Sequence, residues 1–211
     1  MAQEVPAVRL IIISVPPGNT AASIRRCMER FAAVGGCRRA LEYPPHVTLR
    51  TGALVPQREL PDYVEGFRRH LADQEPVEIT TSDFVHAVYS DGQGVSRHFF
   101  GYNVVLTPQL RALYDHLCDY RDYMKSEPGD FWPHLSIAYH DIDSAGAERI
   151  ESLLEENPDA VPGGFRWRCG RVGLYRRIPT PGDPALRGAA TLDPAPRTPR
   201  PAWTEAASIT L

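Results

Sequence analysis

Two short segments of the chain show the same alternation of polar and apolar residues. They read Pro-His-Val-Thr-Leu and Pro-His-Leu-Ser-Ile, and their histidines are His46 and His134. In each segment a hydroxyl residue, Thr48 or Ser136, lies two positions after the histidine, and apolar residues fill the positions between and after. This period of two is typical of a β-strand with one buried face. Each histidine and its hydroxyl partner should therefore point to the same side of a strand.

The hydrophobic pattern along the rest of the chain predicts alternating strands and helices. Strand patterns occur at 8–15, 46–54, 77–89, 98–107, 134–139, 165–177 and 203–211. Helical patterns, with apolar residues three and four positions apart, occur at 19–35, 61–73, 107–124 and 143–157. Asn19 or Thr20 is expected to cap the first helix, and the sequence at 90–94 predicts a hairpin loop. Each half of the chain then carries one motif strand with a helix ahead of it.

Length and composition favour one domain. A chain of 211 residues can bury one substantial core, and we expect 1–211 to form a single domain. The stretch from about 178 to 202 contains seven prolines among small residues, and such a composition does not form a packed element. We therefore expect a long loop there, inserted before a last strand at 203–211.

Charge and targeting signals narrow the function class. The net charge of −3 is not that of a general nucleic-acid binder, so a nucleic-acid substrate should be small or held locally. The four cysteines show neither a Cys-x-x-Cys pair nor a zinc-site spacing, and reduced thiols are expected. The apolar run from Leu10 to Ile13 is too short to span a bilayer. We expect a cytoplasmic protein without membrane association, and the sequence indicates no protein partner.

The duplicated residues suit acid–base chemistry at a phosphate. The pKa of an imidazole is normally about 6.5, so near neutral pH one histidine can hold a proton while the other accepts one. Such a pair can deprotonate a nucleophile on one side of a phosphorus atom and protonate the leaving oxygen on the other. The hydroxyls can donate hydrogen bonds to the non-bridging phosphate oxygens. This design requires no metal ion and no other cofactor.

The paired His-x-Thr and His-x-Ser, each on a predicted strand and about half a chain apart, resemble the signature of the 2H phosphoesterase superfamily. This superfamily includes RNA 2′,3′-cyclic phosphodiesterases and 2′,5′ RNA ligase-like proteins. The resemblance implies an α+β fold of two pseudo-symmetric lobes, each an antiparallel sheet with helices on its outer face, around a central cleft that carries the motif strands. It also implies that His46 and His134 are the acid–base pair and that Thr48 and Ser136 bind the phosphate. Which histidine is the acid and which is the base stays open.

By this resemblance, the chain is a metal-independent phosphodiesterase that hydrolyses a 2′,3′-cyclic phosphate or a related 2′-linked phosphodiester. Its substrate would be an RNA end or a small nucleotide. Two alternatives stay open. A binding module would hold the same ligand without cleaving it. A metal-dependent phosphohydrolase would use His134, His140 and Asp141, with Asp143 nearby, because imidazole and carboxylate are common metal ligands.

Strand parity separates two further candidates for contacts with the substrate. Arg50 lies four positions after His46 and by parity shares its face, where it can contact a phosphate or be solvated at the strand end. Tyr139 lies five positions after His134 and by parity does not share its face. Arg176, near other arginines, can cover the site as part of a cationic lid.

Two aromatic residues are candidates for stacking on a nucleobase. Phe100 and Tyr102 alternate on one face of a predicted strand. Every nucleobase offers a flat face to such side chains. The same alternation also fits residues that belong to the hydrophobic core, so both roles stay open.

Overall fold

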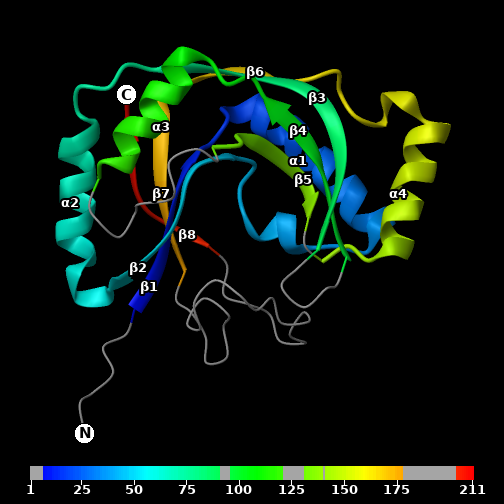
Figure 1. Cartoon of the computed structure of the whole chain (residues 1–211), viewed down its shortest axis with the longest axis horizontal. Helices are drawn as coiled ribbons and strands as arrows, with labels where there is room; N and C mark the ends of the chain where they lie inside the picture. The colour runs from blue at the N-terminus through cyan, green and yellow to red at the C-terminus, as the bar shows by residue number, and fades with distance from the viewer. Residues whose placement is uncertain (1–6, 91–95, 121–130, 140, 178–202) are drawn as a thin grey trace, which may run out of the picture.

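The fold is that of a computed structural model, which describes residues 7–90, 96–120, 131–139, 141–177 and 203–211 (Figure 1). Its strands are β1 (Ala7–Ser14), β2 (Val47–Pro56), β3 (Val77–Ser90), β4 (Ser96–Val104), β5 (His134–Tyr139), β6 (Arg166–Cys169), β7 (Arg171–Arg177) and β8 (Thr204–Thr210). Its α-helices are α1 (Gly18–Gly35), α2 (Leu60–Leu71), α3 (Pro108–Cys118) and α4 (Ser144–Glu156). The predicted strands and helices therefore occur in the predicted order.

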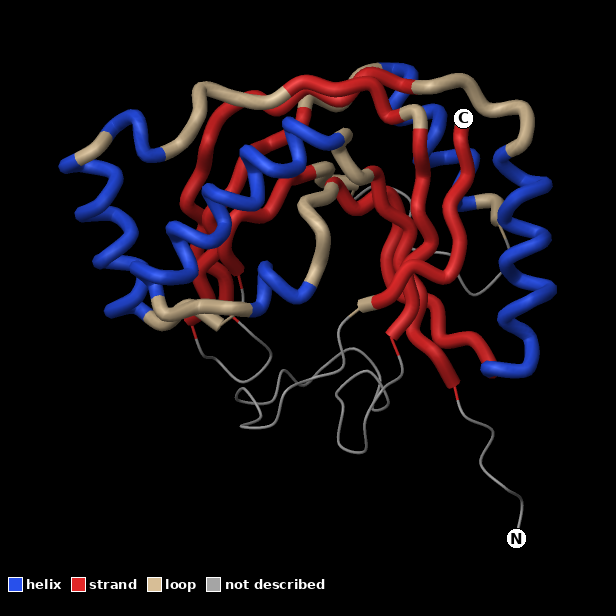
Figure 2. The backbone as a smooth tube through the Cα atoms, turned by 180° about the vertical axis from the view of Figure 1, so that it is seen from behind, coloured by secondary structure: helices blue, strands red, loops and turns tan. Residues whose placement is uncertain are grey.

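The strands form a sheet with two halves. Its order is β6-β3-β4-β5-β2-β1-β7-β8, and all the neighbouring pairs are antiparallel. The half β6-β3-β4-β5 ends on one motif strand, β5, and the half β2-β1-β7-β8 begins with the other, β2. Figures 1 and 2 show α1 and α4 beside the first half, and α2 and α3 beside the second. The predicted α+β fold of two lobes with helices on their outer faces is confirmed.

Helix α1 follows β1, which belongs to the half β2-β1-β7-β8, but it packs on the other half, β6-β3-β4-β5. The ring of Phe31 lies against the rings of Phe84 and Phe100, with centroids 5.8 and 6.1 Å apart. At the crossing with α4, a Cβ on Gly146 would meet the carbonyl oxygen of Gly35, so the two helices approach closely because glycine stands there. This crossover links the two halves through their cores.

The ends of α1 show one confirmed and one wrong prediction. Gly36 adopts a left-handed conformation with φ of 74°, and its N–H donates to the carbonyl of Ala32, which ends the helix where glycine was expected to end it. The helix begins directly after Pro17, ahead of both Asn19 and Thr20. The prediction that one of these two residues caps α1 is therefore wrong.

The predicted strand at 165–177 is in fact two strands. The first part, β6, pairs with β3, and the second part, β7, pairs with β1. The break falls at Gly170, whose N–H donates to the carbonyl of Arg168 at 2.9 Å. The chain crosses here from one half-sheet to the other. Both parts keep a strand pattern, so local alternation alone did not reveal the crossing.

Parts of three predictions lie outside the described residues. These are most of the hairpin loop at 90–94, the end of the helix predicted to reach residue 124, and the proline-rich stretch at 178–202. Helix α3 ends at Cys118, before its predicted end. The last strand is confirmed as β8. In the ranges that the structure describes, no helix combines the length and the apolar character needed to cross a bilayer.

Candidate active site

The two motif strands lie side by side and run antiparallel. Their register pairs Val47 with Leu135, the residues that follow the two histidines. Both of these side chains are fully buried in the core. Because side chains alternate along a strand, the histidines and hydroxyl residues lie on the opposite side of the sheet. We call this side the motif face, and the side that the helices cover the helix face.

The register arranges the four motif side chains as a rectangle. Extending the register of the Val47–Leu135 pair by one residue in each direction places His46 opposite Ser136 and Thr48 opposite His134. Opposed residues of antiparallel strands have Cβ atoms about 4.5–5.5 Å apart, and diagonal neighbours are separated by about 7–8 Å. The two histidines occupy one diagonal of the rectangle. A tetrahedral group between the ring tips can therefore meet both imidazoles and both hydroxyls.

The two imidazoles are held by the same local hydrogen bond. Nδ1 of His46 lies 2.8 Å from the carbonyl oxygen of Pro44, and Nδ1 of His134 lies 2.9 Å from that of Trp132. A carbonyl oxygen only accepts, so each Nδ1 carries the hydrogen. Nε2 is left in each ring to accept or donate a proton. In each motif, the hydrogen bond to the carbonyl two residues earlier thus fixes the orientation of the imidazole ring.

Burial favours the neutral form of both rings. Burial lowers the pKa of His46 to about 4; the hydrogen bond to the Pro44 carbonyl raises this pKa, and a charge on His134 lowers it further. Burial also lowers the pKa of His134, against the hydrogen bond to the Trp132 carbonyl, which raises it. Near neutral pH both rings are therefore unprotonated before an anion binds. An anionic phosphate between them would raise both pKa values and favour uptake of one proton.

The lowered pKa of His46 predicts a pH dependence of stability. Between about pH 6.5 and pH 4 the unfolded chain binds more protons at this residue than the folded protein does. The contribution of His46 to the free energy of unfolding should be complete above pH 6.5 and should be lost as the pH drops towards 4. His46→Gln should reduce this pH dependence, because glutamine does not titrate. Urea denaturation followed by circular dichroism measures the free energy of unfolding of both proteins at pH 7 and pH 5. An equal loss of this free energy between the two pH values in wild type and variant would contradict the prediction.

A β-bulge in β2 overturns the parity argument for Arg50. Thr48 pairs with Ile13, whereas Arg50 pairs with Ile12, so two residues of β2 match one step of β1. Antiparallel partners share a face, and Ile12 is part of the core beneath the helices. Arg50 therefore points to the helix face, and the prediction that it shares the face of His46 is wrong.

Arg50 is instead a buried cation beneath α3. Its side chain is 2% exposed, and its guanidinium lies over the ring of Tyr114, 5.7 Å from the centroid. Its Nε and Nη2 are buried and have no hydrogen-bond partner in the part of the chain that the structure describes. The described residues provide no explanation for these unpaired nitrogens. Arg50 lies on the side of the sheet away from the motif face, where it cannot contact a group bound between the histidines.

A matching bulge in β5 overturns the parity argument for Tyr139. Ser136 pairs with Gly101, whereas Ala138 pairs with Phe100, so β5 also takes two steps where its neighbour takes one. Side chains beyond the bulge change face. Tyr139 therefore lies on the motif face, and the prediction that it does not share the face of the histidine is wrong.

Tyr139 connects the surroundings of the two histidines. It pairs with Phe99, whose ring lies edge-on to that of His134 with centroids 5.1 Å apart. Its side chain also hydrogen-bonds that of Tyr43, and burial is the main cause that holds the pKa of Tyr139 well above its usual value of about 10. The ring of Tyr43 lies 5.2 Å from that of His46. A direct contact between Tyr139 and a substrate stays a prediction.

The other three candidates do not lie beside the motif histidines. Phe100 and Tyr102 are fully buried core residues, and the hydroxyl of Tyr102 donates to the carbonyl of Pro162. Neither ring offers a free face to a nucleobase, so of their two open roles they take the core one. Arg176 pairs with Leu10, a core residue on the helix face. Its role in a lid over the motif face therefore has no support from the register.

The carboxylates proposed for the alternative metal site hydrogen-bond backbone N–H groups instead. Oδ2 of Asp141 accepts hydrogen bonds from the backbone N–H groups of Arg38 and Arg39 at 2.7 and 3.0 Å. Asp143 caps α4 through the N–H of Gly146. Another predicted ligand, at position 140, lies outside the described residues. Within the described ranges, no group of three or more His, Cys, Asp or Glu side chains is placed to hold a metal ion.

Sequence reasoning missed the aromatic residues that flank the histidines. Tyr43 precedes His46 by three positions, and Trp132 precedes His134 by two. The ring of Trp132 lies 4.6 Å from that of His134. An aromatic residue just upstream of each Pro-His pair was visible in the sequence and is the signal that could have found them.

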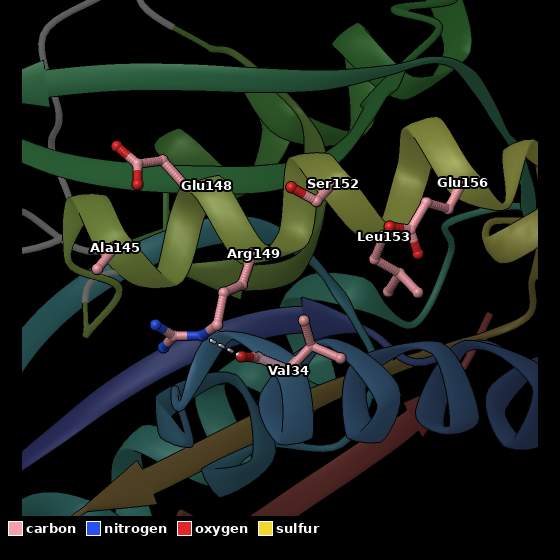
Figure 3. Close-up of a pocket in the computed structure, with 7 residues that line it drawn as sticks. All are labelled: Val34, Ala145, Glu148, Arg149, Ser152, Leu153 and Glu156. Carbon is pink, nitrogen blue, oxygen red and sulfur yellow. Dashed lines mark hydrogen bonds between the residues drawn. The ribbon is translucent and has the colours of Figure 1, made fainter.

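An open groove elsewhere on the surface does not include the motif residues. It runs between α1 and α4 and is lined by residues such as Val34, Glu148 and Leu153 (Figure 3). Arg149 crosses it and donates from Nε to the carbonyl of Val34 at 2.9 Å. This contact satisfies a carbonyl at the end of α1, so the groove is a feature of helix packing.

The fold and the paired motifs define a two-lobed α+β protein with a His-x-Thr/Ser strand in each lobe. The chain belongs to the 2'-5' RNA ligase superfamily, whose sequence pattern matches residues 16–180. The predicted relationship to the 2H phosphoesterases is thereby confirmed. Among curated proteins, none matches the sequence.

Solved structures share the fold at low sequence identity. Escherichia coli LigT complexed with 3'-AMP superposes with a TM-score of 0.61 and 14% identity, over 97% of this chain and 98% of that one. TT0787 of Thermus thermophilus superposes with a TM-score of 0.59 and 16% identity, over 96% of this chain and 97% of that one. These similarities extend over nearly the whole chain and support the two-lobed fold.

Proposed function

We propose that the chain is a metal-independent phosphodiesterase that opens 2′,3′-cyclic phosphates or cleaves related 2′-linked phosphodiesters on RNA ends or small nucleotides. The observation that carries the proposal is the diagonal arrangement of His46 and His134 on one face, each with Nδ1 bonded to a backbone carbonyl and with no partner for Nε2 among the residues that the structure describes. Acid–base catalysis at phosphorus needs two proton-transfer groups on opposite sides of the reacting atom, and this diagonal provides them.

The chemistry follows from the rectangle. One Nε2 accepts a proton from water as the water oxygen bonds to phosphorus, and the other donates a proton to the ribose oxygen as its bond to phosphorus breaks. The hydroxyls of Thr48 and Ser136, on the other diagonal, donate to the non-bridging oxygens, whose charge grows in the transition state. Each motif contributes one histidine and one hydroxyl, so that the duplication itself is explained.

The structural neighbours support a nucleotide as the ligand. Escherichia coli LigT has been crystallised with 3'-AMP and also with phosphate. A nucleoside monophosphate combines the phosphate that the histidines require with a sugar and a base. We propose the same class of ligand for this chain.

Hydrolysis in the presence of a chelator tests this function. Purified protein should convert adenosine 2′,3′-cyclic phosphate to a single monophosphate in excess EDTA, with phosphorus NMR reporting which oxygen keeps the phosphate. Turnover that EDTA abolishes and a divalent metal restores would favour the metal-dependent alternative. Substrate recovered unchanged, despite measurable binding, would favour a binding module.

A further inference from the structure

Trp132 is a large apolar side chain left open to solvent beside a motif histidine. It is 52% exposed, whereas the other two tryptophans, Trp167 and Trp203, are buried. Burying an aromatic ring of this size is normally favourable. An exposed ring beside reactive groups therefore indicates a surface that a ligand can cover. Among the large hydrophobic side chains that the described residues expose, Trp132 is the one aromatic.

The indole ring is fixed from three directions. Its Nε1 donates to Oδ1 of Asn103 at 2.9 Å. Its ring contacts that of Phe99 at 5.4 Å and that of His134 at 4.6 Å between centroids. Asn103 is the β4 partner of His134, so the anchor and the histidine belong to one pair of strands. The ring is thus held in place before any ligand binds, which lowers the entropy cost of stacking against it.

The corresponding aromatic residue beside His46 is already covered. Tyr43 lies 5.2 Å from the imidazole, but the ring of Trp203 stacks on it at 5.2 Å with an angle of 29° between the planes. The side chain of Tyr139 also hydrogen-bonds Tyr43. The protein therefore fills the aromatic wall on the His46 side with its own residues and leaves the wall on the His134 side open.

From this asymmetry we infer that Trp132 is the stacking platform for the base of a nucleotide substrate, on the His134 side of the phosphate. The inference rests on the proposed function and adds the direction in which the substrate lies. An indole face accepts any nucleobase, so the platform favours nucleotides over base-free phosphodiesters without selecting a base. Asn103 acts as a positioning residue that fixes the indole.

The direction of the substrate assigns the two proton transfers. In a nucleoside 2′,3′-cyclic phosphate the base is attached to the ribose, and the ribose carries the leaving oxygen. With the base on Trp132, His134 Nε2–H donates its proton to that oxygen as the bond to phosphorus breaks. His46 Nε2 takes a proton from the water whose oxygen bonds to phosphorus. The bound phosphate favours uptake of one proton, which in this orientation lies on His134, and His46 stays unprotonated, as a general base requires.

Two substrates that differ only in the base test the platform. Adenosine 2′,3′-cyclic phosphate carries a base, and the 2′,3′-cyclic phosphate of methyl ribofuranoside lacks one. Trp132→Ala should raise KM for the first substrate on the order of tenfold with little change in kcat, and should leave both constants for the second unchanged. Trp132→Phe, which keeps an aromatic face, should restore most of the affinity, and Asn103→Ala should give an intermediate loss. Val88→Ala, a change at an exposed apolar residue of β3, is the matched control.

The outcomes separate the platform from the proposed function. If wild-type protein hydrolyses both substrates and Trp132→Ala affects them equally or not at all, the platform is overturned while the function stands. If neither substrate is hydrolysed, the proposed function fails, and titration with 3'-AMP still tests the platform by tryptophan fluorescence. Quenching that Trp132→Phe abolishes supports it, and quenching that persists in this variant overturns it.

Discussion

His46→Gln and His134→Gln should each lower kcat for 2′,3′-cyclic phosphate hydrolysis by about 10²- to 10⁴-fold, the usual contribution of a positioned proton-transfer group. Glutamine approximates the size of imidazole but has no proton to transfer near neutral pH. Because substrate binding also uses the two hydroxyls, KM should change much less than kcat. Initial rates at saturating substrate, with phosphorus NMR to identify the product, provide the measurement.

The control for this prediction is a third histidine changed in the same way. His86 lies outside the motifs, where its Nδ1 bonds Glu151 and its ring stacks on Phe100. His86→Gln should keep activity near the wild-type value. The double variant of the two motif histidines should lose little more than either single variant, since residues that act as a unit are not additive. Wild-type kcat in either motif variant, with the fold intact by circular dichroism, would refute the acid–base pair.

The sequence predicted the parts of the site that depend on local pattern. The strands of both motifs follow from alternation over five residues, and the face shared by each histidine and its hydroxyl follows from the period of two. The α+β class follows from the order of strand and helix patterns, and the pairing of the lobes follows from the family resemblance. These features are properties of short segments or of a family.

The sequence did not predict what depends on neighbouring strands. A bulge after Thr48 and another after Ser136 turn Arg50 and Tyr139 to the faces opposite to those expected from parity. Nothing in the residue types of either segment requires an extra residue there. The bulges arise from matching each motif strand to its neighbour, which is a tertiary effect.

The aromatic residues show the same limit at longer range. Phe100 is covered because α1, which leaves the other half-sheet, lays Phe31 against it. Alternation along β4 cannot report which face a distant helix will cover. Trp132 lies two residues before β5, outside the strand, so alternation along the strand does not predict whether its side chain is exposed. Alternation therefore left both roles open for Phe100, and it gave no signal for the exposed aromatic residue two positions before the motif histidine.

Gly101→Ala should destabilise the protein and disturb the site, because the bulge beside Ser136 leaves no room for a side chain at this position. A Cβ on Gly101 would meet the backbone carbonyl oxygen of Leu135 and would lie 2.6 Å from Cζ of Phe99. The phenyl ring can turn aside, but the carbonyl belongs to the motif strand and can move only with it. We expect a loss of about 1–3 kcal/mol in the free energy of unfolding, the usual cost of overpacking.

This variant should lose activity as well as stability, since Leu135 is the residue whose pairing with Val47 sets the rectangle. A shift of β5 away from β4 carries Ser136 and His134 with it, and small displacements of catalytic groups lower kcat strongly. Gly170→Ala is the matched control, because a Cβ there meets nothing within 4 Å. Urea denaturation and initial rates measure both effects. An alanine at 101 that leaves both at wild-type values would mean that β4 and β5 tolerate separation here, and the close approach of Gly101 to Leu135 would then have no role in holding β5 in place.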